Sequence, residues 1–94
     1  MRIIWAPLAL EDVRGISDWL KRDASPGTAL RIVGNIRSRA RFLENFPRGG
    51  RPHGLNQRVL RVLDTPYLIR YRIKNDVVEV IRVHHEREDW QLEP

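Results

Sequence analysis

Apolar residues recur at helical spacing in two long stretches of the N-terminal half of the chain. Pro7 opens the first stretch and Pro26 the second, and both suit the first position of a helix, where the N–H that proline lacks would have no partner. Ser25 stands just before Pro26, where its side chain can cap the second helix. The break at residues 23–26 predicts an antiparallel helical hairpin. The apolar stripes are Ala9, Val13, Ile16 and Leu20 in the first helix and Ala29, Ile32, Val33, Ile36, Ala40 and Leu43 in the second.

The remaining apolar runs are short and rich in β-branched and aromatic residues, which is typical of strands. They cover residues 2–5, 58–63, 67–73 and 77–83, with turns at 64–66 and 74–76. Residues 47–54 hold three glycines and two prolines and are predicted to form a loop. The order β-α-α-β-β-β indicates an α+β fold of one domain, residues 1–94, with the helical hairpin packed on one face of a small, mostly antiparallel sheet.

Side-chain alternation assigns the residues of the last two strands to the two faces of the sheet. In the strand 67–73, the odd-numbered residues are expected to face the helices and the even-numbered ones the opposite side. In the last strand, residues 80, 82 and 84 should share one face, and 81, 83 and 85 the other. Arg61, Arg70, Arg72 and Arg82 would then form a basic sheet face if the strand register permits, and an ordinary solvated face is the equally weighted alternative.

Charge is concentrated in the middle of this chain of 94 residues, whose net charge is +5. Residues 24–61 carry eight arginines against the single Glu44, and arginine suits either phosphate or an acidic protein partner. So small a domain has a thin core, which predicts that a partner protein stabilises it.

Composition also excludes several classes of site. The sequence has no cysteine and three histidines, so neither a disulfide framework nor a metal site is expected, and no cofactor is indicated. No run approaches the roughly 18 apolar residues of a membrane span, and the N-terminus does not resemble a signal peptide. We therefore expect a cytoplasmic protein without membrane contacts.

Two C-terminal segments resemble a known family. Residues 67–71 (Tyr-Leu-Ile-Arg-Tyr) and 81–90 (Ile-Arg-Val-His-His-Glu-Arg-Glu-Asp-Trp) look like the C-terminal half of the RelE/ParE superfamily, the toxins of bacterial type II toxin–antitoxin pairs. The run from His85 to Trp90 is more similar to the ParE branch. This resemblance implies a toxin that inhibits DNA gyrase by binding it, without catalytic residues of its own. It also implies a cognate antitoxin, ParD-like or similar, whose acidic tail folds onto the toxin.

The RelE branch of the same superfamily implies an alternative, a ribosome-dependent endoribonuclease that cuts mRNA. The candidates for such chemistry are Arg61, Arg82, His84 and His85, because cations stabilise a phosphorane and histidine can act as acid or base. The match to that branch is incomplete. Leu68 and Glu86 stand where basic residues are expected, and no tyrosine follows Trp90. A basic RNA-binding module without toxicity is a third alternative.

Two sets of binding residues follow from the resemblance and from the charge pattern. In the target-binding set, at least one of Arg87 and Trp90 is expected to be structural, because Trp90 can fold back on the sheet and Arg87 can pair with Asp89 or Glu86. The predicted target-binding residues are His85, Glu86, Arg87, Asp89 and Trp90. The predicted antitoxin-binding residues are Val13, Trp19, Leu20, Arg37, Arg41 and Arg61.

Overall fold

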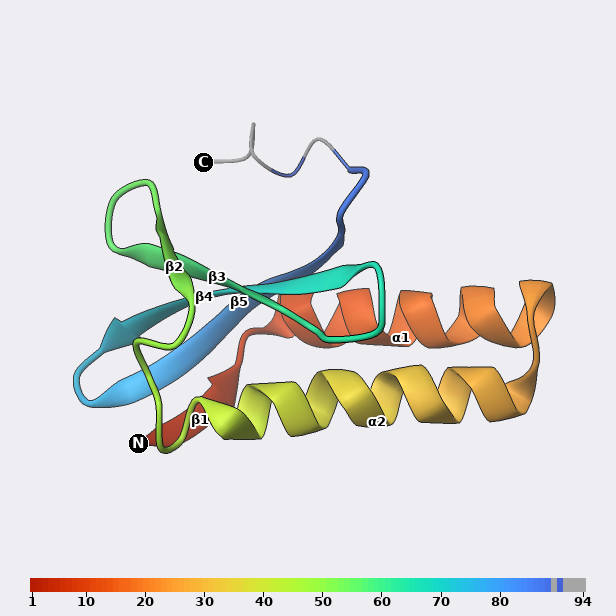
Figure 1. Cartoon of the computed structure of the whole chain (residues 1–94), viewed down its shortest axis with the longest axis horizontal. Coiled ribbons are helices and arrows are strands. Elements are labelled where there is room, and N and C mark those ends of the chain that lie inside the picture. The colour runs from red at the N-terminus through yellow and green to blue at the C-terminus, as the bar shows by residue number, and fades with distance from the viewer. Residues whose placement is uncertain (89, 91–94) are drawn as a thin grey trace.

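The computed structural model describes residues 1–88 and 90, and these form two helices and a five-stranded sheet (Figure 1). The predicted element order is confirmed, with one additional short strand. The elements are β1 (Arg2–Trp5), α1 (Pro7–Asp23), α2 (Pro26–Phe42), β2 (Arg51–His53), β3 (Gln57–Arg61), β4 (Tyr67–Lys74) and β5 (Val77–His85).

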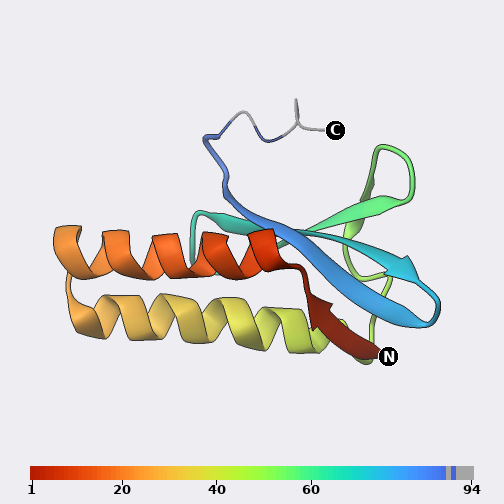
Figure 2. The ribbon, with the colours of Figure 1, turned by 180° about the vertical axis from the view of Figure 1, so that it is seen from behind.

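The strands lie in the order β1-β5-β4-β3-β2, so the first strand of the chain pairs with the last (Figure 2). That pair is parallel, with Arg2 opposite Val77 and Trp5 opposite Val80. The other three pairs are antiparallel. Both helices cover one face of the sheet (Figure 1), which confirms the predicted architecture.

The additional strand β2 corrects the prediction of a loop over residues 47–54. Arg51 pairs with Val59 and His53 with Gln57, which adds β2 to the edge of the sheet. An edge strand tolerates Pro52, because the missing N–H removes no bond from a ladder on the outer side. A strand of three residues that contains proline has too little periodicity to be recognised from sequence.

Both helices begin as predicted, at Pro7 and Pro26. The Ser25 hydroxyl accepts a hydrogen bond from the Thr28 N–H at 3.0 Å, which satisfies one of the free donors of the first turn of α2. The apolar stripes of the two helices pack on the sheet. The sheet residues in that core are Leu60, Tyr67, Ile69, Tyr71, Val78, Val80 and Val83, and Val62, just after β3, joins them.

A β-bulge corrects the predicted faces of β5. The register passes from Arg70 opposite Arg82 to Tyr71 opposite Val80, so Ile81 is an extra residue on β5. Both Val80 and Val83 therefore face the helices, whereas strict alternation placed residue 80 with residue 84. Sequence alternation cannot anticipate a bulge, because the extra residue is defined only by the partner strand.

Tyr71 ties the loop after α2 to the sheet. Its hydroxyl donates to the Pro47 carbonyl at 2.8 Å and accepts from the Gly50 N–H at 2.9 Å. The Arg58 guanidinium donates to the Gly50 carbonyl at 2.7 Å, so the loop is held from both β4 and β3. Burial raises the pKa of Tyr71, and the Gly50 N–H and the charge of Arg58 lower it by less.

In the described residues, neither helix has the length and apolar character needed to span a bilayer.

Candidate functional site

Strand β5 leads into a turn of residues 86–88, called here the C-terminal turn, which hydrogen bonds fix in place. The Glu88 carboxylate accepts from the His85 N–H at 2.8 Å, and the Glu86 N–H donates to the Pro66 carbonyl at 2.8 Å. The Arg87 N–H donates to His85 Nδ1 at 3.1 Å. The guanidinium of Arg87 is exposed and makes no hydrogen bond or ion pair within the described residues. The turn thus presents one cation to solvent from a fixed backbone.

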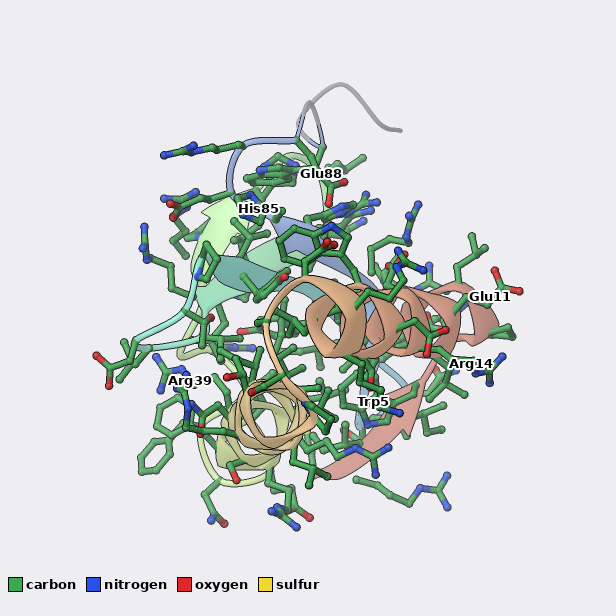
Figure 3. The ribbon with its side chains drawn as sticks, turned by 90° about the vertical axis from the view of Figure 1, so that its right-hand side faces the viewer. Trp5, Glu11, Arg14, Arg39, His85 and Glu88 are labelled. Atoms are coloured by element: carbon green, nitrogen blue, oxygen red, sulfur yellow. The ribbon has the colours of Figure 1, made fainter. Side chains whose placement is uncertain are left out.

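His85 lies at the base of the C-terminal turn, half-buried (Figure 3). Its ring meets the ring of Tyr67 edge to face, with centroids 5.5 Å apart. Burial raises the pKa of Tyr67, and the nearby negative charge of Glu88 raises it further. His85 is therefore packed on one side and open on the other.

Trp90 is buried, with only 3% of its surface exposed. Its ring packs on the rings of His53, at a centroid distance of 4.9 Å, and His84, at 5.7 Å. It forms a second apolar cluster with Val59 and Leu68, on the opposite face of the sheet from the helices. Of the two residues left open by the sequence, Trp90 is therefore structural and Arg87 is exposed. The predicted target-binding residue Asp89 lies outside the described residues.

Beneath Trp90 lies a buried pair of polar side chains, Arg70 and His84. Arg70 is 3% exposed, and it donates from Nε to His84 Nε2 at 3.3 Å and from Nη1 to Gln57 Oε1 at 3.1 Å. A guanidinium can only donate, so His84 Nε2 must accept and the ring proton belongs on Nδ1, which lies 3.4 Å from a Glu88 oxygen. His84 is fully buried with both ring nitrogens engaged, so neither faces a substrate.

The predicted basic sheet face forms only in part, and acidic groups balance it. Leu60, Ile69 and Tyr71 face the helices, so Arg61, Arg70 and Arg72, which are adjacent to them in their strands, face the other way. Arg82 instead bonds to Asp12 of α1, a helix on the other face. Arg70 is buried, and the other three arginines each contact a carboxylate. These pairs are Arg61 with Glu86 at 3.3 Å, Arg72 with Glu79 at 2.6 Å and Arg82 with Asp12 at 2.7 Å.

A groove of about 490 Å³ runs between α1 and α2, called here the interhelical groove. Its walls carry four cations against one carboxylate, Asp18, and Trp5 of β1 contributes to its apolar part (Figure 3). The full lining is Trp5, Leu10, Val13, Arg14, Ser17, Asp18, Lys21, Val33, Arg37 and Arg41. The groove therefore combines an apolar surface with a positive rim.

The predicted antitoxin-binding residues divide between this groove and other places. Val13, Arg37 and Arg41 line it. Leu20 is buried in the core and offers little surface, and Trp19 is half-exposed on α1 but does not line the groove. Arg61 lies on the sheet, beside Glu86.

Comparison with known proteins identifies the family. Residues 3–90 match the family described as ParE toxin of type II toxin-antitoxin system, parDE. The chain belongs to the ParE toxin family. It is a toxin of a type II toxin–antitoxin system, and its two-helix, five-strand fold is a ParE fold.

Two named relatives are also toxins by name. The chain is 36% identical over 90 residues to a putative toxin, Y4kP, of Sinorhizobium fredii, covering 95% of this chain and 92% of the relative. It is 31% identical over 84 residues to toxin RelE2 of Caulobacter vibrioides, covering 89% and 93%.

Two solved structures share the fold of this ParE chain. One is a chromosomal ParDE toxin–antitoxin system from P. aeruginosa, with a TM-score of 0.83, 24% identity, and coverage of 90% of this chain and 95% of that one. The other is the isolated E. coli RelE toxin, with a TM-score of 0.61, 16% identity, and coverage of 95% and 88%. Both likenesses concern the fold.

Several residues of these ParE surfaces were not predicted from the sequence. Arg14 and Lys21 carry half of the positive rim of the groove, and their spacing of seven residues on one helix face was a usable signal. Asp12 accepts from both Arg82 and the Val83 N–H across 70 residues of chain, which no local pattern reveals. His53 was given no role in the sequence, yet it packs on Trp90.

Proposed function

We propose that this chain is a ParE-like toxin that inhibits DNA gyrase by binding it and is neutralised by a cognate antitoxin. The observation that carries the proposal is the family match over residues 3–90. The burial and pairing of the residues that were candidates for ribonuclease chemistry support the proposal as well. His84 is fully buried, and Arg61 and Arg82 are each paired with a carboxylate, so these groups are not arranged around an open site.

The surface proposed to contact gyrase is the exposed part of the C-terminal turn together with His85. Arg87 projects from a backbone that is already fixed, so little conformational entropy is lost when a partner binds it. Arginine is also among the residues most often found as interface anchors. Glu86 is engaged by Arg61, which leaves Arg87 as the main charge offered to the target.

The surface proposed to bind the antitoxin is the interhelical groove. An acidic, amphipathic segment would lay its apolar side chains against Trp5, Val13 and Val33 and its carboxylates against Arg37 and Arg41. A disordered acidic tail is drawn to such a surface by charge and folds as it binds. The site of action, where both partners are available, is proposed to be the cytoplasm.

A direct test is the inhibition of DNA supercoiling by purified gyrase as the toxin, freed from its antitoxin, is titrated in. Arg87→Ala should weaken inhibition while the protein still folds, and Arg22→Ala, an exposed arginine at the end of α1, is the matched control. Wild-type protein that is folded and leaves supercoiling intact would reject gyrase as the target.

The groove is tested separately. Charge reversal of Arg37 and Arg41 to Glu should weaken antitoxin binding by at least tenfold, since it replaces attraction with like-charge repulsion at a site lined by both residues. The same variant should inhibit gyrase as well as the wild type does. Unchanged antitoxin affinity would remove the groove as the binding surface.

A ribosome-dependent mRNA endoribonuclease is the second candidate, favoured by the 31% identity to a protein named toxin RelE2. Its signature is transcript cleavage at codon boundaries after the toxin is induced. Intact transcripts in growth-arrested cells would exclude it.

A further inference from the structure

His53 sits at the end of β2, where the chain turns through residues 54–56 into β3. Figure 1 shows this hairpin rising on the side of the sheet away from the helices, the side on which the C-terminal turn also lies. The His53 ring packs on Trp90 at a centroid distance of 4.9 Å, tilted by 49°. Trp90 also stacks on His84, at 5.7 Å and 21°. The indole thus contacts two imidazoles from different strands, an arrangement called here the clamp.

The clamp belongs to a closed circuit of contacts. His53 is opposite Gln57 in the β2–β3 pair, and Gln57 accepts from Arg70 at 3.1 Å. Arg70 in turn donates to His84, which stacks on Trp90. The contacts therefore run from the hairpin through β3, β4 and β5 back to the indole ring, so the position of the hairpin and the position of Trp90 depend on each other.

The C-terminal turn is held at both of its ends, by the end of β5 on one side and by the buried Trp90 on the other. Glu88 holds the turn to the end of β5, with one carboxylate oxygen on the His85 N–H and the other 3.4 Å from His84 Nδ1. Trp90 follows two residues later and is buried in the second apolar cluster. Arg87 therefore lies, along the chain, between residues that are held in place, while its own side chain is exposed.

We infer that His53 and Trp90 are positioning residues for Arg87: the hairpin holds the indole, and the indole holds the C-terminal turn in the orientation that its target recognises. This inference rests on the proposed role of the turn as the target-binding surface. It assigns His53 a function through Trp90 and no contact of its own with the target.

The test compares His53→Ala, which removes the ring, with His53→Phe, which keeps a ring able to stack on the indole. An aromatic pair of this kind supports about a 2- to 10-fold difference in potency. His53→Ala should lose that factor in growth arrest and in gyrase inhibition, and His53→Phe should restore it. Antitoxin affinity should stay at the wild-type value in both, because the interhelical groove lies on the other side of the sheet.

Phe46→Ala is the matched control, because it removes an exposed ring that also packs on a neighbouring ring at 4.9 Å, in this case Phe42. It should leave toxicity unchanged.

The fluorescence of Trp90 reports directly on its contact with His53. When Trp5→Phe and Trp19→Phe are introduced, Trp90 is the only tryptophan left. Its emission should shift to the red with His53→Ala and not with His53→Phe.

Three outcomes overturn the inference: full potency of His53→Ala, failure of His53→Phe to restore potency, or a parallel loss of antitoxin affinity, which would mean general destabilisation. The growth-arrest arm does not depend on the identity of the target. Wild-type toxin that arrests growth without inhibiting gyrase would reject the proposed target, and the comparison of the two His53 variants would still decide the positioning role.

Discussion

Replacing Tyr71 with phenylalanine removes a single oxygen atom, and with it both hydrogen bonds that tie the loop after α2 to β4. A typical net contribution is about 0.5–1.5 kcal/mol for each bond, so the free energy of unfolding should fall by about 1–3 kcal/mol. The loss should lie toward the upper end, because Gly50 is buried and water cannot readily replace the acceptor of its N–H. For a domain of this size the melting temperature should fall by roughly 4–8 °C for each kcal/mol.

The assay is urea unfolding of the free toxin followed by far-ultraviolet circular dichroism, with the slope of the transition checked for constancy. Tyr67→Phe is the matched control, because Tyr67 lies in the same core and no hydrogen bond to its hydroxyl is described. A loss for Tyr71→Phe no larger than that for Tyr67→Phe would refute the assignment of the loop anchor.

Alkaline pH provides a second arm of the same test. The pKa of Tyr71 is raised in the folded state, so folding favours the neutral phenol. The contribution of neutral Tyr71 to the free energy of unfolding is intact below the ordinary tyrosine pKa of about 10. It is lost as the pH rises through the raised pKa of the folded state. Wild-type stability should therefore fall above about pH 10, and Tyr71→Phe should fall less steeply. Equal slopes for the two proteins would contradict this.

Three further substitutions test other parts of the packing. Gly50→Ala should cost about 1–3 kcal/mol, because a Cβ there would lie 2.8 Å from the Tyr71 ring, and thermal unfolding measures the loss. Gly34→Ala should instead add about 0.5–1 kcal/mol in the same assay, since Gly34 is exposed and its added carbon would contact nothing beyond the adjacent backbone of its own helix; a loss there would contradict the open surface. Asp12→Asn should cost about 1.5–3 kcal/mol in urea unfolding, because the carboxylate accepts two bonds from Arg82; stability equal to the wild type would show that this pair contributes nothing.

The helices and the central strands could be predicted because their signals are local. Stripes of apolar residues with the right period, Pro26 and its capping Ser25 define α2 without reference to the rest of the chain. The same holds for β4, whose odd-numbered residues face the core as predicted. β2 and the bulge at Ile81 were missed because each exists only in relation to a partner strand.

The candidate surfaces were predicted less completely, for a related reason. Arg37 and Arg41 were identified because a run of arginines on a helix is visible in the sequence. The burial of Trp90 was not decidable, since it depends on His53 and His84 arriving from two other strands. The predicted basic sheet face illustrates the limit: Arg61 and Arg72 share a face, but each is paired with a carboxylate, and Arg82 is bonded to Asp12 of α1.

The parallel pairing of β1 with β5 has a consequence for the making of the protein. β1 is synthesised before the other described elements, yet its partner in the sheet, β5, is the last of the described strands along the chain. Until Val77 and the residues after it emerge, Ile3 and Trp5 have no sheet to join, and the core lacks Val78, Val80 and Val83. Such long-range pairing delays folding to the end of translation. A chain that stops before β5 therefore lacks both the partner strand of β1 and a part of the core.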